Sequence, residues 1–200
     1  MAQPASHRLS RAACAVLATL VIASCATTPP LPPADWNRAK AERQQLERWH
    51  MKGRAAVATE NDGWTASVAW SQDSARSELQ LQGALGVGGV HVKSDGQGVE
   101  IETSKGEKIN ADNANAALEQ TIGIALPLGS LRYWLLGVPD PALPAVEELD
   151  DQGRLSRMEQ DGWQATYDRY AYQNEAWLPG RMRLEKGAVR VRVIVEQWRF

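Results

Sequence analysis

Short runs of alternating apolar and polar residues begin at Trp49, and they constrain the fold of this chain more than any other feature. A period of two is typical of β-strands with one buried face. Turn sequences separate the runs, among them Asn61-Asp62-Gly63, Ser94-Asp95-Gly96 and Lys105-Gly106. Because such tight turns join antiparallel neighbours, the pattern favours a meander of hairpins over β-α-β crossover units. The runs predicted as strands in this part are 51–57, 64–70, 79–81, 90–92 and 99–101.

A second set of alternating runs follows Pro144, at residues 145–149, 155–160, 163–172, 182–184 and 189–198. Together the two sets predict about eleven antiparallel strands, which are too many to stay in a flat sheet. The fold class that we predict is therefore mainly β, with the sheet curled into an unclosed half-barrel.

Three segments carry helical periodicity instead. The first runs from an N-cap at Asp35 to about residue 48, with Ala39 on its apolar face and Arg43 on its outer face. The other two interrupt the strands: residues 112–122 stop at Gly123, and residues 130–136 begin behind a cap at Ser130. Their position between the two sets predicts a helical lid over the half-barrel, which encloses either a solid core or an apolar cavity.

The N-terminus has the features of a lipoprotein signal peptide. Basic residues at positions 7, 8 and 11 precede an apolar run at 12–23 that is too short to be a membrane span. The sequence Ile22-Ala23-Ser24-Cys25 resembles the lipobox of bacterial lipoproteins, in which the cysteine becomes the acylated first residue. We therefore expect residues 1–24 to be removed and Cys25 to carry an N-acyl chain and an S-diacylglycerol. The alternative is an uncleaved anchor with an incidental cysteine.

The expected processing divides the chain into three parts. Residues 25–34 contain four prolines and form a lipidated tether, and residues 35–200 form the folded domain. The only other cysteine, Cys14, leaves with the signal peptide, so the mature chain has no free thiol for a disulfide or for catalysis. The residue after Cys25 is Ala26 and not the aspartate that retains lipoproteins in the inner membrane of enteric bacteria. That resemblance implies a lipid-anchored protein of the outer membrane whose domain faces the periplasm.

Composition excludes several classes of protein. A net charge of −2 is unlike that of a strongly basic nucleic-acid binder, and no long apolar run follows the first thirty residues. Eight tryptophans accompany a single phenylalanine. An indole offers a large apolar body with one N–H donor, which suits the wall of a sheet or of an apolar cavity.

Motifs along nearly the whole mature chain resemble, in order and spacing, the LolB family of outer-membrane lipoproteins. The most specific is Pro127-Leu128-x-x-Leu131-x-x-Trp134-Leu135-x-Gly137, and others are Trp49-His50-Met51-Lys52-Gly53-Arg54, Trp70, Gly83-Ala84-Leu85-Gly86, Gly162-Trp163-x-x-x-Tyr167, Leu178-Pro179 and Trp198. Ala84 departs from the family, which often has proline there.

The resemblance implies an unclosed β-barrel with a helical lid. It also implies a protein that accepts acylated lipoproteins from the periplasmic carrier LolA and places them in the outer membrane. An apolar cavity would receive the acyl chains. Its expected lining residues are Trp49, Met51, Trp64, Val68, Trp70, Leu79, Leu81, Leu126, Leu131, Trp134, Leu135 and Leu184. Core packing is the alternative role of each.

A glycine-rich segment at residues 83–89 presents Leu85 and Val87 at the tip of a predicted hairpin. As a phosphate-binding loop it lacks a following lysine and helix. By resemblance to the family, Leu85 meets the bilayer when cargo is inserted, with Val87 beside it. The alternative is a mobile hairpin whose Leu85 tucks back into the core.

Other functions have little support in the sequence. The mature chain keeps two histidines, His50 and His91, which lie in strand patterns without the spacing of a catalytic or metal site, so we expect no enzyme, metal or cofactor. Arg190 and Arg192 lie either on a solvated outer face or on a docking stripe for an acidic carrier. We expect a monomer that binds outer-membrane lipids and no nucleic acid. A free-lipid or glycolipid-binding lipoprotein and a cavity-free scaffold lipoprotein remain alternatives.

Overall fold

A computed structural model describes residues 35–83, 88–173 and 175–200. The predicted signal peptide, Cys25, the tether, Leu85 and Val87 lie outside the described residues. Within them, no helix is long and apolar enough to span a membrane.

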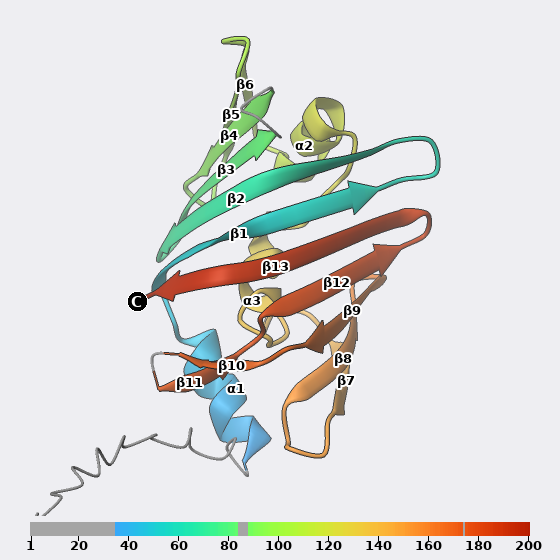
Figure 1. Ribbon diagram of the computed structural model, residues 1–200. Coiled ribbons are helices and arrows are strands. Elements are labelled where there is room, and N and C mark those ends of the chain that lie inside the picture. Colours follow the sequence, from blue (N-terminus) through green and yellow to red (C-terminus); the bar gives the residue numbers. More distant parts are fainter. Residues whose placement is uncertain (1–34, 84–87, 174) are drawn as a thin grey trace, which may run out of the picture.

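Eleven strands form one antiparallel sheet whose order is β6-β5-β4-β3-β2-β1-β13-β12-β9-β8-β7 (Figure 1). The first meander comprises β1 (Arg48–Ala58), β2 (Gly63–Asp73), β3 (Arg76–Gly83), β4 (Gly89–Ser94), β5 (Val99–Thr103) and β6 (Lys108–Ala111). The second comprises β7 (Ala145–Leu149), β8 (Leu155–Gln160), β9 (Trp163–Asp168), β12 (Arg181–Lys186) and β13 (Val189–Arg199). The two meanders join where β1 pairs with β13, and the edge strands β6 and β7 do not pair with each other. The predicted unclosed, mainly β fold is therefore confirmed.

Two strand predictions need correction. The expected strand 163–172 ends at Asp168, because Arg169 adopts a left-handed backbone (φ 54°) that breaks the extended conformation. The chain then forms a separate two-stranded sheet from β10 (Ala171–Gln173) and β11 (Ala176–Leu178). Strand β6 was not predicted, since its four residues are too few to display a convincing alternation.

The helices depart from the predictions in three places. α1 (Trp36–Gln44) is capped by Asp35 as expected but ends before residue 48, where β1 begins. Arg43, predicted on its outer face, is buried beside the ring of Trp36. α3 (Leu128–Trp134) follows Pro127, whereas the hydroxyl of Ser130, the predicted cap, donates to Asp140 Oδ2 instead.

α2 (Ala114–Ile122) agrees with the sequence. The side chain of Asn113 accepts a hydrogen bond from the N–H of Ala116 at its start. Gly123 ends the helix in the left-handed conformation, with φ 81°. α2 and α3 connect the two meanders and lie on one side of the curved sheet (Figure 1).

A register shift in the central strand pair explains the glycine of the Lys52-Gly53 motif. The pairing of β1 with β13 shifts between these two residues. A Cβ atom at Gly53 would lie 2.1 Å from the backbone oxygen of Ile194, which is closer than real Cβ atoms approach. Only glycine therefore lets the two strands approach at this irregularity.

Candidate functional site

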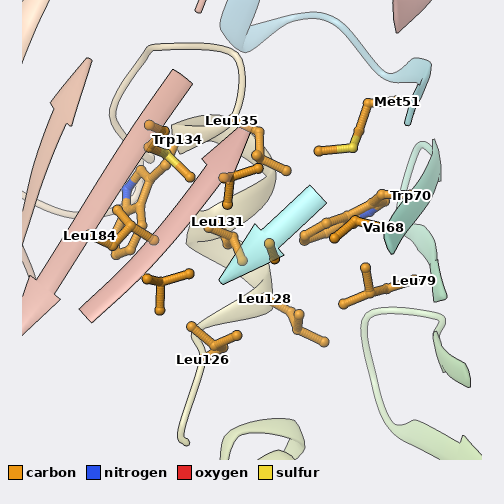
Figure 2. Packing of buried hydrophobic residues seen from close by; sticks show 14 of the residues in the cluster. Met51, Val68, Trp70, Leu79, Leu126, Leu128, Leu131, Trp134, Leu135 and Leu184 are labelled. Carbon is orange, nitrogen blue, oxygen red and sulfur yellow. The ribbon is translucent and has the colours of Figure 1, made fainter. Parts of the chain in front are cut away.

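Helix α3 and the residues on either side of it, 126–137, are called here the α3 segment or lid segment. This segment packs its apolar side against the inner face of the sheet. Leu131 and Leu135 come from this segment, and Val68 and Trp70 come from β2 (Figure 2). All four are buried in one continuous hydrophobic cluster. The alternation in β2 places Val68 and Trp70 inward, as the period of two predicts.

A cavity of about 40 Å³ remains between the α3 segment and the sheet. Its lining consists only of apolar residues: Met51, Ala55, Val57, Trp64, Val68, Trp70, Leu79, Leu81, Leu126, Leu131, Leu135, Val191 and Val193. Nine of these are among the twelve residues expected from the sequence. With no charged group in its wall, the cavity suits an apolar ligand.

The cavity is far smaller than the roughly 300–1,000 Å³ of ordinary ligand sites. In the conformation described, the interior is therefore closed by leucine side chains of the α3 segment. An acyl chain can enter only if these side chains move away from the sheet.

Three expected lining residues lie outside the cavity wall. Trp49 packs against the rings of Trp70 and Trp198, with centroid distances of 5.8 and 5.4 Å. Trp134 and Leu184 are both fully buried and lie at the other side of α3 (Figure 2). These three residues are buried in the core but do not line the cavity.

Two tryptophan N–H groups tie the lid helices to the sheet. Trp64 Nε1 in β2 donates to the carbonyl oxygen of Ile122, the last residue of α2, at 3.2 Å. Trp134 Nε1, at the end of α3, donates to Gln160 Oε1 in β8 at 2.7 Å. The rings of Trp134 lie in the hydrophobic cluster, and those of Trp64 pack against it. Each indole uses its N–H to hold a helix end.

Gln160 is a residue of the site that sequence reasoning missed. It is 2% exposed, and its Nε2 donates to the carbonyl oxygens of Asp140 and Leu143 at 3.0 and 2.9 Å. Its Oε1 also accepts from the N–H of Asp140. The one signal in the sequence is that a polar residue, Gln160, occupies an inward position at the end of a predicted strand. This signal does not show which groups Gln160 binds.

The ionisable groups of the sheet keep the interior neutral. Tyr167 points inward from β9, and burial raises the pKa of its phenol well above the ordinary value, so the group stays protonated. His50 Nδ1 shares a hydrogen bond with Ser71 Oγ at 2.8 Å, and burial lowers the pKa of its imidazole. His91 Nε2 lies 2.6 Å from Glu78 Oε1 on the neighbouring strand.

A family profile described as "Outer membrane lipoprotein LolB" matches residues 47–198. This chain belongs to the LolB family. It is 33% identical to "Outer-membrane lipoprotein LolB" of Alkalilimnicola ehrlichii, over 96% of this chain and 98% of the relative. The protein of that name from Nitrosococcus oceani is 32% identical, over 92% of this chain and 95% of the relative.

Solved structures support the fold. A LolA superfamily protein from Nitrosomonas europaea superposes with a TM-score of 0.56 at 7% identity, covering 84% of this chain and 94% of that one. A putative outer membrane lipoprotein-sorting protein domain from Vibrio parahaemolyticus gives 0.52 at 7% identity, covering 82% and 90%. This chain therefore shares its fold with these two proteins.

Two motifs on which the LolB resemblance rests meet in space. Gly137, after the Trp134-Leu135 pair, adopts φ 71°. A Cβ atom on it would lie 2.8 Å from Cγ of Pro179, which belongs to the Leu178-Pro179 motif. The close approach explains why the end of the lid segment carries a glycine.

Proposed function

We propose that this chain is a lipid-anchored receptor of the outer membrane that accepts acylated lipoproteins from a LolA-like periplasmic carrier and inserts them into the membrane. The observation that carries the proposal is the wholly apolar wall beneath the α3 segment. Membership of the LolB family adds to it. The domain faces the periplasm in this scheme, and no enzymatic step is involved.

Replacing the leucine side chains of the lid by an acyl chain is favourable in free energy. Moving Leu126, Leu131 and Leu135 into water costs about 1.5–3 kcal/mol for each side chain. An acyl chain gains about 0.8 kcal/mol for each methylene that it buries. About six to eleven methylenes therefore offset the opening of the lid. Transfer then requires only that affinity increase from carrier to receptor to bilayer, and no nucleotide.

Two segments outside the described residues complete the proposal. Cys25 would carry the acyl groups that hold the protein at the membrane, since two or more chains suffice for stable anchoring. Leu85, with Val87, would touch the bilayer when cargo leaves the interior. Both assignments rest on the lipobox-like sequence and on the resemblance of the loop to that of the family.

Quenching of tryptophan fluorescence tests where the acyl chain lies. A lipopeptide with a brominated acyl chain should quench Trp64 and Trp70, because both line the cavity. The variants Trp64→Phe and Trp70→Phe should each lose part of the quenching. Trp177→Phe is the matched control, since Trp177 lies in β11 and outside the cavity wall. Equal quenching in all three variants would contradict binding at this site.

A second arm separates the cargo classes. Free phospholipid is added as a competitor at the concentration of the lipopeptide. A receptor for acylated proteins should keep its lipopeptide, whereas a free-lipid carrier should exchange it. Full displacement by phospholipid would favour the free-lipid alternative.

A further inference from the structure

Basic residues lie on the outer face of the central strands β1, β12 and β13. This face points away from α2 and α3 (Figure 1). Along β1, β12 and β13 they alternate with residues buried in the core. The register confirms a shared face, because Arg192 is the cross-strand partner of both Ala56 and Arg183. We call this set the basic face; it comprises Lys52, Arg54, Arg181, Arg183, Arg190 and Arg192.

Carboxylates neutralise part of the basic face. Arg181 and Arg183 share one carboxylate, that of Asp168, at 2.5 and 3.3 Å. Arg54 pairs with Glu196 at 2.7 Å, and both of these side chains are largely exposed. Exposed pairs of this kind are weak and leave their charges accessible to other ions.

Lys52 and Arg192 carry the positive charge of the face that no carboxylate faces. Within the described parts of the chain, Lys52, Arg190 and Arg192 form no ion pair, and of these three only Arg190 has an acidic cross-strand partner, Glu185. Arg192 also lies directly opposite Arg183 on the neighbouring strand. Like charges in that position destabilise a sheet, so an external anion between them would stabilise the face.

The other half of the outer face has the opposite arrangement. There Lys93 of β4 lies between Glu78 of β3 and Glu100 of β5 as cross-strand partner of both. Unlike charges therefore alternate across those strands, although the whole chain carries a net charge of −2. The concentration of positive charge is specific to β1, β12 and β13.

The surface beside the basic face can accommodate a headgroup. A groove of about 590 Å³ is lined by Arg54 and Arg192 together with the small side chains of Ala56, Thr65 and Ser67. Guanidinium groups bind phosphate oxygens in a bidentate manner. The two arginines thus border a space in which a phosphodiester would meet both.

We propose that the basic face docks on the anionic phospholipid headgroups of the membrane, and that it holds the sheet against the bilayer surface. The inference rests on the proposed function for placing the chain beside a membrane. A protein partner is less suited to this face, because interface hot spots use tryptophan and tyrosine as well as arginine, and the basic face has no exposed aromatic side chain. The large apolar side chains that are exposed in the described residues lie elsewhere, at Leu143, Val146, Leu149, Tyr172 and Phe200.

A single fluorescent label can report the docking. The mature lipidated chain is expected to have no free thiol, so Ala56→Cys places one environment-sensitive dye between Thr65 and Arg192. The labelled protein is reconstituted by its anchor into vesicles of neutral lipid alone or with about 30% phosphatidylglycerol, an anionic lipid. We expect a blue shift in emission only in the anionic vesicles. The shift should disappear at about 0.5 M salt, which screens such contacts.

Charge variants test the residues. Removing two arginines in Arg183→Gln/Arg192→Gln should lower the ratio of docked to undocked protein about thirtyfold, because each basic residue contributes about 1 kcal/mol at an anionic surface. Arg38→Gln/Lys105→Gln is the matched control, which removes the same charge from exposed positions off the basic face. It should leave the docked fraction unchanged.

Several results would overturn the inference. One is the absence of a blue shift in anionic vesicles, and another is an equal loss of docking in the control variant. A shift produced by an acidic carrier protein and not by anionic lipid would assign the face to a protein partner. Transfer of cargo from carrier to receptor is measured on the same samples. Normal transfer without docking would contradict only the proposal that the basic face binds anionic lipid. Loss of transfer would contradict the proposed function as a receptor for acylated lipoproteins.

Discussion

The indole N–H of Trp134 donates to the side-chain oxygen of Gln160 at 2.7 Å, and both residues are almost completely buried. The bond joins the last residue of α3 to the last residue of β8. Because Gln160 also binds the backbone of Asp140 and Leu143, one side chain fixes both the lid helix and the loop that leads to β7. Motion of the lid toward an open state must therefore either keep this contact as a pivot or break it.

Gln160→Leu tests that contact. The substitution leaves the N–H of Trp134 and the backbone groups of Asp140 and Leu143 without their partner in a buried place. We expect a loss of about 3 kcal/mol in the free energy of unfolding, because unsatisfied buried polar groups cost about 1–3 kcal/mol each and some will rearrange. Urea denaturation measures it. Gln164→Leu, on the outer face of β9, is the control and should change stability by less than about 0.5 kcal/mol; similar losses in both would contradict a special role of Gln160.

Trp134→Ser separates the lid from plain core packing. Trp134 is fully buried, so the free energy of unfolding should fall by about 3–5 kcal/mol. If Trp134 also positions the lid, uptake of an acylated lipopeptide should weaken at temperatures where the variant remains folded. A lower melting temperature with unchanged uptake would assign Trp134 to the core alone.

The order and facing of the strands could be predicted from the sequence because both are local properties. A period of two determines which residues of β2 point inward, and tight turns such as residues 61–63 determine which strands are neighbours. The burial of Arg43 could not be predicted. Its position on α1 falls on the polar face of the helix, and it is buried only because parts of the chain that are distant in sequence pack over it. Gln160 was missed for the same reason: its partners lie 17 to 26 residues away in sequence.

The size of the cavity could not be predicted from the sequence either. Alternation distinguishes inner from outer residues, but a packed core and a ligand cavity have the same alternation. The placement of Leu184 and Trp49 outside the cavity wall depends on how far each side chain reaches, which is a property of the assembled sheet.

Gly137→Ala should destabilise the end of the lid segment. The new methyl group would lie 2.8 Å from Cγ of Pro179, on a backbone with φ 71° that L-residues rarely adopt. We expect a loss of about 1–3 kcal/mol in the free energy of unfolding. The double variant with Pro179→Ala should recover the steric part of this loss, and a strictly additive double variant would contradict the contact.

Asp168 makes stability depend on acid pH. Its carboxylate accepts two hydrogen bonds from Arg181, and this pairing lowers the pKa of Asp168 below the ordinary value of 3.8. The unfolded chain therefore binds a proton more readily than the folded chain. The stabilisation is fully present above about pH 4–5 and is lost as the pH falls through the lowered pKa.

The expected size of this contribution is about 1 kcal/mol, because the pair is partly exposed and screened by solvent. Asp168→Asn should lower stability at neutral pH by that amount and flatten the decline of stability on acidification. Chemical denaturation at a series of pH values measures both. An unchanged acid slope in Asp168→Asn would assign the pH dependence to other carboxylates.

Leu131→Ala distinguishes a lid from a static core by its effect on binding. Leu131 lines the cavity from α3, and it is among the side chains that must leave the sheet before an acyl chain can enter. Alanine leaves a larger void and should cost about 2–5 kcal/mol of stability. It also removes apolar surface whose exposure opposes opening, worth about 1.5–3 kcal/mol, so the affinity for an acylated lipopeptide should rise about tenfold or more.

Leu184→Ala is the matched control, because Leu184 is equally a buried leucine but lies outside the cavity wall. It should lose similar stability without a gain in affinity. Lipopeptide titrations and urea melts on both variants decide between the two roles. If both variants bind more tightly, general loosening of the domain explains uptake. If Leu131→Ala binds more weakly, the leucine contacts the acyl chain directly and does not compete with it for the sheet.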